Sequence, residues 1–413
     1  MRLDMPGVIL TTCQAFDSDF PSGVNEIAMT LRGKQLGVSV HKRVEGRFPD
    51  GELCIDIPEG ADGRTVLIGQ SLSGGRTEPD AAIMSLLAIA RCYREHGAGP
   101  IIAVVPHLAY ARHDRTIPGE RRPVMAGLLA DLLAAAGVTG VVALASGAEQ
   151  KLSRLFEATA TRLTLVDTHR LRLSMLRPLV GSGSVIVSPD RGAHDAARAL
   201  ASDLGVMLIE AEKHRLGPEA VEVALPPTVG TGEGRHLVVV DDLITSAATV
   251  DMTVRAIRSS FRNPRIDVVV THLRLTSRGL ERLTKLRQSG FIHRICATNA
   301  TGRLVELDGL SITPAVPHLA RALGSLFARS RIASVSQGSP PVERLSSPGR
   351  WLGLGRSDAG VPKVGQPWSH SLGRAPSRSR PCIAAVGRST ATLCRRRRPG
   401  RSAVLLRQRQ PGR

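Results

Sequence analysis

The stretch from residue 237 to residue 257 constrains the fold most, because it joins a buried strand, two carboxylates and the start of a helix. Residues 237–240 (LVVV) are apolar and mostly β-branched. This predicts a strand covered on both faces, as in a parallel sheet. Asp241 and Asp242 stand where that strand is expected to end, and residues 252–257 have helical spacing. The order strand, short turn, helix predicts an α/β fold.

The turn between this strand and helix predicts an anion site. Free backbone N–H groups and the positive end of the helix dipole would point at the turn, and hydroxyls would add donors. Asp241 and Asp242 would repel a phosphate, so we expect them to face sugar hydroxyls or a metal. Together these features predict a phosphorylated sugar as ligand, while a plain βα turn with a capping Thr or Ser is the alternative. The turn residues are Thr245, Ser246, Ala247, Ala248 and Thr249.

The formal net charge of +19 at pH 7 raises the question of nucleic-acid binding. Residues 336–413 hold 16 Lys or Arg against only Glu343 and Asp358, so this tail supplies most of the excess. Nucleic-acid binding is therefore not expected for the folded part. The tail is rich in Ser, Pro, Gly and Arg without periodicity, which predicts disorder. An arm for a nucleic acid or acidic partner and an extension without function are both open.

Length and cysteine usage indicate a cytoplasmic protein of two domains. The 413 residues contain no apolar run of eighteen or more, so no membrane span is expected. The N-terminal residues lack the apolar core of a signal peptide. The six cysteines are scattered without a CxxC pair, which favours reduced thiols over disulfides or zinc.

An internal repeat predicts how the chain is divided. Residues 64–93 follow the same layout as residues 235–257: an Arg, an apolar strand, a loop of small residues and a helix. Two related α/β domains about 170 residues apart are the expectation, at 1–158 and 159–335, followed by the tail at 336–413. We expect the second domain to begin with a strand near residue 163 and to close with a helix at 316–327. The first copy lacks the acidic pair, so the second is expected to bind the sugar phosphate.

Two polar segments of the first half suit a nucleotide. The sequence RFPDGE at 47–52 predicts a turn that brings Phe48, Asp50 and Glu52 together. An aromatic face and two acceptors suit a purine and its exocyclic amine, although a plain hairpin turn is equally consistent. The sequence YARHDR at 110–115 follows a buried strand, where ligands of open α/β sheets bind. Its two arginines suit a triphosphate, and a surface salt-bridge loop is the alternative.

Two segments of the second half suit phosphoryl chemistry. Asp190 follows a short apolar strand and places a carboxylate in a turn. Lys213 and Arg215 are two residues apart in an extended segment, so their side chains point the same way. Both cations would reach a phosphoryl group in transfer, while a solvated basic loop is the alternative.

Residues 7–330 resemble the ribose-phosphate pyrophosphokinases, the PRPP synthetases. The resemblance rests on five motifs in the family's order and spacing: RFPDGE at 47–52, YARHDR at 110–115, VSPD at 187–190, KHR at 213–215 and VDD at 240–242. It implies two tandem type I phosphoribosyltransferase-like domains, each a parallel sheet flanked by helices. It also implies transfer of the β,γ-diphosphoryl group of ATP to the 1-hydroxyl of ribose 5-phosphate with Mg²⁺, in a homo-oligomer.

The resemblance also implies roles for single residues. Lys213 would be the catalytic lysine, with Arg215 as its partner on the phosphates, and Asp190 would be linked to magnesium. Asp241 and Asp242 would face the ribose hydroxyls. The 5-phosphate would lie in the turn of Thr245, Ser246, Ala247, Ala248 and Thr249. ATP would be held by Phe48, Asp50, Gly51, Glu52, Arg112 and His113.

Three departures from the family pattern leave alternatives open. Residues 145–147 read Ala-Ser-Gly where the family usually has Asp-Leu-His, so the metal-linked histidine is absent. Ala248 replaces a glycine of the phosphate loop, and its Cβ would crowd the phosphate. Arg191 and Ala193 replace glycines that follow the aspartate. The chain is therefore expected to be a divergent PRPP synthetase or a catalytically weak or inactive regulatory homologue. A phosphoribosyltransferase that consumes PRPP is disfavoured by the motifs at 47–52 and 213–215.

Overall fold

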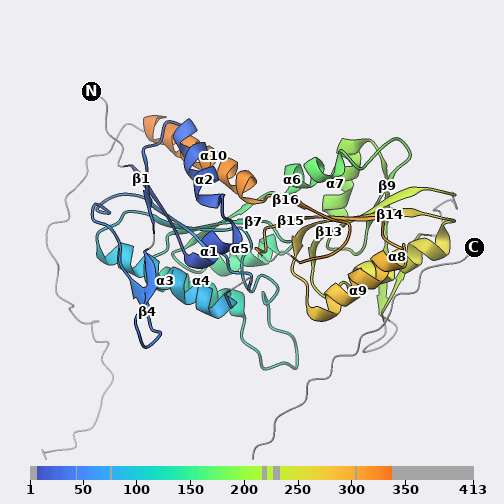
Figure 1. Cartoon of the computed structure of the whole chain (residues 1–413), viewed down its shortest axis with the longest axis horizontal. Coiled ribbons are helices and arrows are strands. Elements are labelled where there is room, and N and C mark those ends of the chain that lie inside the picture. Colours follow the sequence, from blue (N-terminus) through green and yellow to red (C-terminus); the bar gives the residue numbers. More distant parts are fainter. Residues whose placement is uncertain are drawn as a thin grey trace, which may run out of the picture. The chain divides into compact units, whose positions relative to one another are not determined.

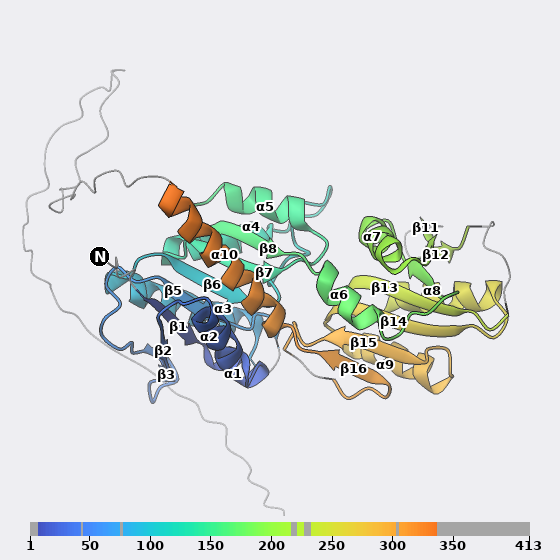
Figure 2. The same cartoon turned by 90° about the horizontal axis from the view of Figure 1, so that it is seen from above.

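Two six-stranded parallel sheets form the framework of this computed structural model (Figures 1 and 2). The structure describes residues 7–42, 44–74, 77–215, 221–226, 233–302 and 305–336. All of them lie within one compact unit, residues 1–341. The predicted disordered tail lies outside the described residues.

The first sheet has the strand order β2-β1-β5-β6-β7-β8, with every neighbouring pair parallel. Its central strands are apolar runs with both faces covered, as buried parallel strands require. Its strands are β1 (Val8–Thr12), β2 (Val38–His41), β5 (Val66–Gly69), β6 (Ile101–Val105), β7 (Gly140–Leu144) and β8 (Arg162–Val166).

The second sheet repeats this topology with the order β10-β9-β13-β14-β15-β16, again parallel throughout. β5 and β13 hold equivalent positions in the two orders, which confirms the internal repeat and the α/β prediction. The strands are β9 (Val185–Ser188), β10 (Met207–Glu210), β13 (His236–Ile244), β14 (Arg265–Leu273), β15 (Arg294–Thr298) and β16 (Leu310–Thr313).

Two antiparallel hairpins stand apart from the sheets. One joins β3 (Glu45–Arg47) to β4 (Leu53–Ile55), and its turn carries the PDG sequence. The other pairs β11 (Glu212–Arg215) with β12 (Val221–Ala224), in the segment that was expected to be extended.

Helices cover both faces of each sheet (Figure 2). Side chains that alternate along a strand enter separate cores: Ile9 and Ile68 pack with α3 and α4, whereas Leu10 and Leu67 pack with α2 and α10. The helices are α1 (Gln14–Asp19), α2 (Gly23–Gly33), α3 (Pro79–Glu95), α4 (Met125–Ala136), α5 (Glu149–Glu157), α6 (His169–Leu176), α7 (His194–Leu204), α8 (Ala248–Ser260), α9 (Ser277–Gln288) and α10 (Val316–Ser336).

The predicted assignment of two elements to the second half is wrong. β8 pairs in register with β7, so it is the edge strand of the first sheet and the boundary after residue 158 falls one strand too early. α10 packs against α2 of the first half, and the two helices lie side by side in Figures 1 and 2. Hydrophobic periodicity gives an element's type but not its partner, and these partners are distant in sequence.

The predicted end of the strand after residue 240 is also wrong. β13 runs on through the acidic pair to Ile244, and Asp241 lies opposite Val270 of β14. β14 has nine residues, so backbone pairing continues past the point where the side chains turn polar.

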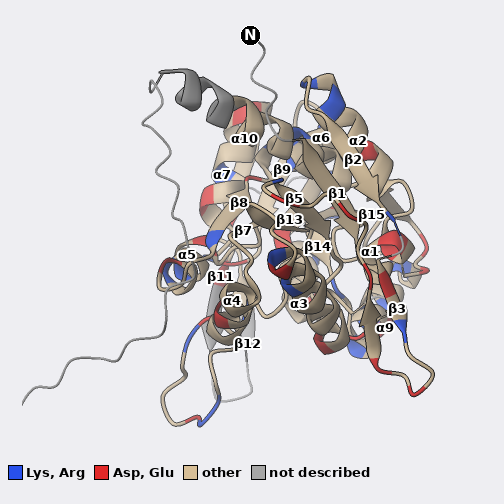
Figure 3. Cartoon of the chain, turned by 90° about the vertical axis from the view of Figure 1, so that its left-hand side faces the viewer, with Lys and Arg blue, Asp and Glu red and all other residues tan. Residues whose placement is uncertain are grey.

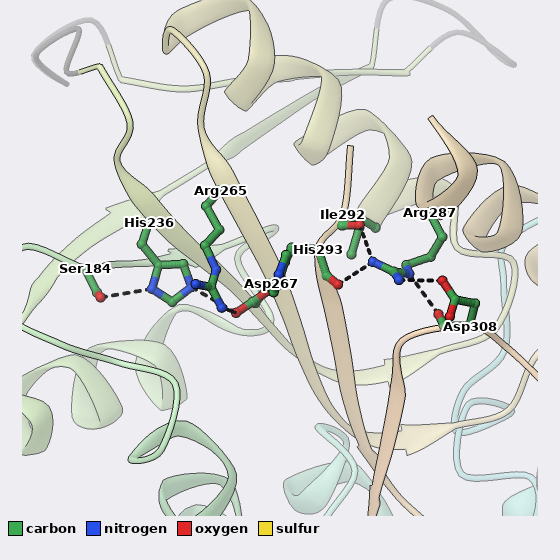
Figure 4. A network of polar contacts seen from close by, with 8 residues as sticks. All are labelled: Ser184, His236, Arg265, Asp267, Arg287, Ile292, His293 and Asp308. Atoms are coloured by element: carbon green, nitrogen blue, oxygen red, sulfur yellow. Dashed lines mark hydrogen bonds and ion pairs between the residues drawn. The ribbon is translucent and has the colours of Figure 1, made fainter. Parts of the chain in front are cut away.

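A polar network ties together the N-terminal ends of the second sheet's strands (Figure 4). The fully buried Asp267 accepts hydrogen bonds from His236 at 3.0 Å and His293 at 3.2 Å. Arg265 adds an ion pair at 3.6 Å, and Ser184 bonds to the other ring nitrogen of His236 at 3.1 Å. Ligands of parallel sheets bind at the opposite, carboxyl end, so we interpret this network as structural.

Both signs of charge occur along the described part of the chain. In the view of Figure 3, segments with Lys or Arg and segments with Asp or Glu are both scattered over a ribbon of mostly other residues. Among the described helices, none is long and apolar enough to cross a membrane. The four cysteines in the described part, Cys13, Cys54, Cys92 and Cys296, are all free thiols.

Candidate active site

A polar pocket of about 440 Å³ opens at the carboxyl ends of β9 and β13 and is closed on its other side by loops of the first half. This is the position expected for a ligand of an open α/β sheet. Its lining is Arg112, Asp114, Arg115, Ser146, Gly147, Ala148, Lys151, Asp190, Gly192, Asp241, Asp242, Leu243, Ile244, Thr245, Ser246, Ala247, Ala248, Thr249 and Val250.

The predicted phosphate loop forms one wall of this pocket. α8 begins at Ala248, and the residue before it, Ala247, has φ 54° and ψ 15°. This left-handed residue lets the chain leave β13 and enter the helix within three residues, so the first N–H groups of α8 face the pocket. A non-glycine residue in this conformation is uncommon and is held by its surroundings.

Helix α9 supports the loop from behind. Arg282 Nη1 donates to the carbonyl of Ser246 at 2.8 Å, and the amide of Thr276 donates to the carbonyl of Thr245 at 3.1 Å. Gly279 passes so close that a Cβ there would overlap the carbonyl oxygen of Thr245. The carbonyls of Thr245 and Ser246 are therefore hydrogen-bonded to Arg282 of α9 and to Thr276, the residue before this helix.

Three carboxylates form the floor. Asp241 is buried and accepts from the amide of Asp242 at 2.8 Å, and Asp242 accepts from the amide of Leu243 at 3.0 Å. Burial, then the neighbouring Asp242 and Asp190, raise the pKa of Asp241 well above its usual range. Negative charge is thus in excess at this point, which suits a bound cation or hydroxyl donors.

Arg112 and His107 of the first half contact the second half beside the pocket. Arg112 Nη1 donates to Thr245 Oγ1 at 3.1 Å, so a predicted ATP residue touches the predicted phosphate loop. His107 and His272, both buried, have their Nδ1 atoms 3.1 Å apart, and His272 Nε2 lies 2.9 Å from the carbonyl oxygen of Ala145. A carbonyl only accepts, so His272 carries its proton on Nε2 and His107 donates from Nδ1.

Burial lowers the pKa of both imidazoles. His272 and Arg274 lower the pKa of His107 further. For His272, Arg172 lowers the pKa, whereas Asp242 and Glu149 raise it. The cationic form of either ring is disfavoured here, so the pair is neutral near pH 7.

Gly147 accommodates the carboxylate of Asp242. Gly147 has φ 85°, its amide donates to Glu149 Oε1 at 2.8 Å, and a Cβ at this position would overlap Asp242 Oδ2. The missing side chain at 147 therefore gives the space into which Asp242 extends from the opposite wall. A larger residue here would require another placement of this carboxylate.

The residues predicted for ATP are not all in one place. Phe48, Asp50, Gly51 and Glu52 lie in the β3–β4 turn and do not line the pocket. Phe48 is 51% exposed, and the turn is closed by its own bonds, including one from the amide of Glu52 to Asp50 Oδ1 at 3.0 Å. His113 lines an adjoining hollow of about 300 Å³ together with Arg112 and Thr245. The turn therefore offers an aromatic face to the outside.

The two predicted catalytic cations are placed only by their backbone. Lys213 and Arg215 lie in β11, where Lys213 pairs with Val223 and Arg215 with Val221. Their side chains lie outside what the structure describes. The two residues are i and i+2 in this strand, and their predicted roles stay predictions.

Known proteins with similar sequences decide the family. Residues 24–137 match the model of the N-terminal domain of ribose phosphate pyrophosphokinase. The ribose-phosphate pyrophosphokinase of Methanopyrus kandleri is 32% identical over 274 residues, which cover 66% of this chain and 87% of that protein. The chain belongs to the ribose-phosphate pyrophosphokinase family. The family member from Helicobacter pylori is 26% identical over 304 residues, covering 73% of this chain and 90% of that protein.

A solved structure agrees with the ribose-phosphate pyrophosphokinase fold. Phosphoribosylpyrophosphate synthetase from Mycobacterium smegmatis superposes with a TM-score of 0.62, at 22% identity, over 78% of this chain and 99% of that chain. The predicted fold class, two parallel sheets flanked by helices, is thus confirmed.

Several residues in or beside the pocket of this family member were given no role from the sequence. Lys151 and Ser146 line the pocket from the first half, and Gly279 and Arg282 support the loop from α9. Arg172 lies buried on α6 with no hydrogen-bond partner for its Nε among the described residues. Burial lowers the pKa of its guanidinium, and Asp242 is the charged neighbour that opposes this shift most. Helix α5, which carries Lys151, was itself missed, although Leu152 and Phe156 at i and i+4 are a helical signal.

Proposed function

We propose that this pocket carries the ribose-phosphate diphosphokinase reaction, in which ATP and ribose 5-phosphate give PRPP and AMP. The observation that supports this most is the contact between Arg112 and Thr245, because it joins a cationic nucleotide wall to a phosphate loop across one pocket. The 1-hydroxyl oxygen of the sugar would attack the β-phosphorus of ATP, the bond from that phosphorus to the α,β-bridging oxygen would break, and the hydroxyl proton would be lost to solvent or base.

Each wall has a task in this proposal. Thr245, Ser246, Ala247, Ala248 and Thr249 would hold the 5-phosphate at the N-terminus of α8. Asp241 and Asp242 would face the ribose hydroxyls. Lys213 and Arg215 would neutralise the transferring diphosphoryl group. Phe48, Asp50, Gly51 and Glu52 would bind adenine, with Arg112 and His113 on the phosphates.

Magnesium fits this pocket as a partner of the substrates. Among the residues that the structure describes, no group of three or more His, Cys, Asp or Glu side chains is arranged to hold a metal alone. Mg²⁺ bound to nucleotides often takes only one or two carboxylates and completes its shell with phosphate oxygens and water. Asp190 beside the charge-rich Asp241 and Asp242 supplies such carboxylates. The ion would neutralise charge on the phosphates.

The two halves, the cell compartment and assembly are part of the proposal. We assign β8 and α10 to the first phosphoribosyltransferase-like half, because they pair and pack there. Free thiols in the described part support the cytoplasm. A homo-oligomer is proposed from the family resemblance, and light scattering of the purified chain measures it. No observation among the described residues favours an inactive regulatory homologue.

The test is turnover by the purified full chain. With ATP, ribose 5-phosphate and Mg²⁺, we expect AMP and PRPP to form in equal amounts, as separated by ion-exchange chromatography. Production of ADP instead of AMP, or binding without turnover, would contradict the proposal.

The role of Lys213 has its own test. Lys213→Ala is expected to lower kcat on the order of 10²–10³-fold with ATP binding largely kept, because the residue stabilises charge in transfer. Lys285→Ala is the matched control, since Lys285 is an exposed lysine on α9 that forms an ion pair with Glu281 of the same helix. Equal kcat values for both variants would remove Lys213 from the mechanism.

A further inference from the structure

The two walls of the pocket carry opposite charge. The second half contributes the carboxylates Asp190, Asp241 and Asp242. The first half contributes three cations, Arg112, Arg115 and Lys151, and one carboxylate, Asp114. A polyphosphate that enters this pocket is repelled by the first set and attracted by the second. The motifs recognised in the sequence account for both arginines, but they leave Lys151 without a role.

Lys151 faces the pocket because of its place on α5. Ala148 and Lys151 are three residues apart on this turn and share a side, and both line the pocket. The apolar side of the helix, Leu152 and Phe156, is buried in the core of the first half. The helix therefore has one possible orientation, and this orientation directs the lysine at the pocket.

A carboxylate holds the ammonium group in place. Lys151 Nζ lies 3.4 Å from Asp114 Oδ2, and the side chain of Asp114 is 9% exposed while that of Lys151 is 47% exposed. An ammonium has three donors, and Asp114 takes one. The other donors stay on the accessible side, in a position already fixed before a ligand arrives, which lowers the entropy cost of binding.

We propose that Lys151 is a further binding residue that contacts the β- and γ-phosphates of ATP from the first half of the chain. This inference rests on the proposed function for the identity of the nucleotide. It adds to the pocket a cation that stands across from the carboxylates, four residues beyond the glycine that takes the place of the family's metal-linked histidine. Positive charge for the phosphates would then come from side chains of the first half, including Lys151.

The experiment compares ATP with AMP. Lys151→Met keeps the length of the side chain and removes its charge, and binding of each nucleotide is measured by calorimetry in the presence and absence of Mg²⁺. A charge-assisted hydrogen bond predicts ATP binding weaker by about ten- to a hundred-fold, with AMP binding unchanged, because AMP lacks the β- and γ-phosphates. Lys151→Arg is expected to restore most of the affinity, and Lys285→Met is the matched control.

The outcomes separate this inference from the proposed function. Equal weakening of ATP and AMP binding would show a structural role for Lys151, and unchanged ATP binding in Lys151→Met and in a second variant, Lys151→Gln, would overturn the proposal outright. In steady-state assays the KM for ATP should rise with kcat little changed. If the wild-type chain forms no PRPP, the proposed function fails, yet the difference between ATP and AMP still decides whether Lys151 binds phosphates.

Discussion

At the scale of single residues, Asp241 shows a conflict between stability and function. Its pKa is raised in the folded state, first by burial and then by its carboxylate neighbours. The folded protein therefore binds this proton more tightly than the unfolded chain, whose aspartates titrate at about 3.9. The stability that this group contributes is full below the unfolded pKa and is lost as pH rises through the folded pKa.

Asp241→Asn should therefore stabilise the free protein while it damages activity. We expect the thermal midpoint at neutral pH to rise by roughly 2–4 °C and PRPP formation to fall by at least about ten-fold. Scanning calorimetry and the turnover assay measure these. Asp251→Asn, at a partly buried carboxylate that pairs with Arg255, should not raise the midpoint. A lower midpoint for Asp241→Asn would show that the carboxylate stabilises the fold instead.

A second prediction at this scale concerns Gly147, which leaves space for the carboxylate of Asp242. Gly147→Ala strains a left-handed residue and also pushes Asp242 from its position, since the new Cβ would overlap Oδ2. Gly183→Ala, at φ 91° with open space around it, pays only the backbone strain. We expect both variants to lose about 1–2 kcal/mol of unfolding free energy from strain, measured in urea, but only Gly147→Ala to lose activity. Equal activity of the two would mean that Asp242 is not needed where it lies.

Single residues also mark the limit of what the sequence predicts. Asp241, Asp242, Asp190 and the 245–249 turn were expected in one site, and they line one pocket. Lys151 was missed because the sequence around it contains no signal for its contact with Asp114, which is 37 positions away. Local patterns report the backbone, whereas this contact is decided by packing.

At the scale of elements, the phosphate loop depends on the helix behind it. Arg282 of α9 donates to the carbonyl of Ser246, so Arg282→Ala frees the loop without touching the pocket lining. The loss of one charge-assisted bond predicts a KM for ribose 5-phosphate higher by about ten-fold, with the KM for ATP unchanged. Steady-state kinetics with Lys285→Ala as control decide this. A rise in both KM values would place the effect on the fold as a whole.

A helix or strand was predictable where the hydrophobic periodicity of its own residues was strong. β5, β6, β9 and α3 appear close to where hydrophobic pattern had placed them. β16 and α6 were missed: β16 is a short edge strand, and α6 carries a buried arginine within its apolar side. Strand pairing explains two further differences from the prediction: β8 pairs with β7 of the first sheet, and β13 continues through its acidic pair because it stays paired with β14.

At the scale of the whole molecule, the two halves meet through His107 and His272 next to the active site. Both pKa values are lowered in the folded state, first by burial. Unfolded histidines titrate at about 6.5, so the unfolded chain takes up protons first as pH falls. Stability is full above about pH 6.5 and decreases below it until the folded pKa values are reached.

His107→Gln should make stability less dependent on pH in this range. A glutamine amide can still donate to His272, but it does not titrate, so the fall in thermal midpoint from about pH 7.5 to about pH 5.5 should be smaller by roughly 2–4 °C. Scanning calorimetry at both pH values measures this. An identical fall in the wild type and the variant would mean that other groups control acid sensitivity.

The architecture was predictable at this scale because the same pattern of strand, loop and helix occurs in both halves of the sequence, and both halves fold with the same strand order. The way in which the halves face each other was not predictable, since the contacts of His107 and Arg112 with the second half join residues more than a hundred positions apart. The active site is formed by that arrangement.

The central claim is diphosphoryl transfer, and the most direct measurement follows the label from ATP. Full-length protein is incubated with ribose 5-phosphate, Mg²⁺ and ATP carrying ³²P at the α, β or γ position in separate reactions. The account predicts that label from both the β and γ positions appears in PRPP, and that label from the α position appears in AMP. Label from the γ position alone in the sugar product, with ADP left behind, would contradict it.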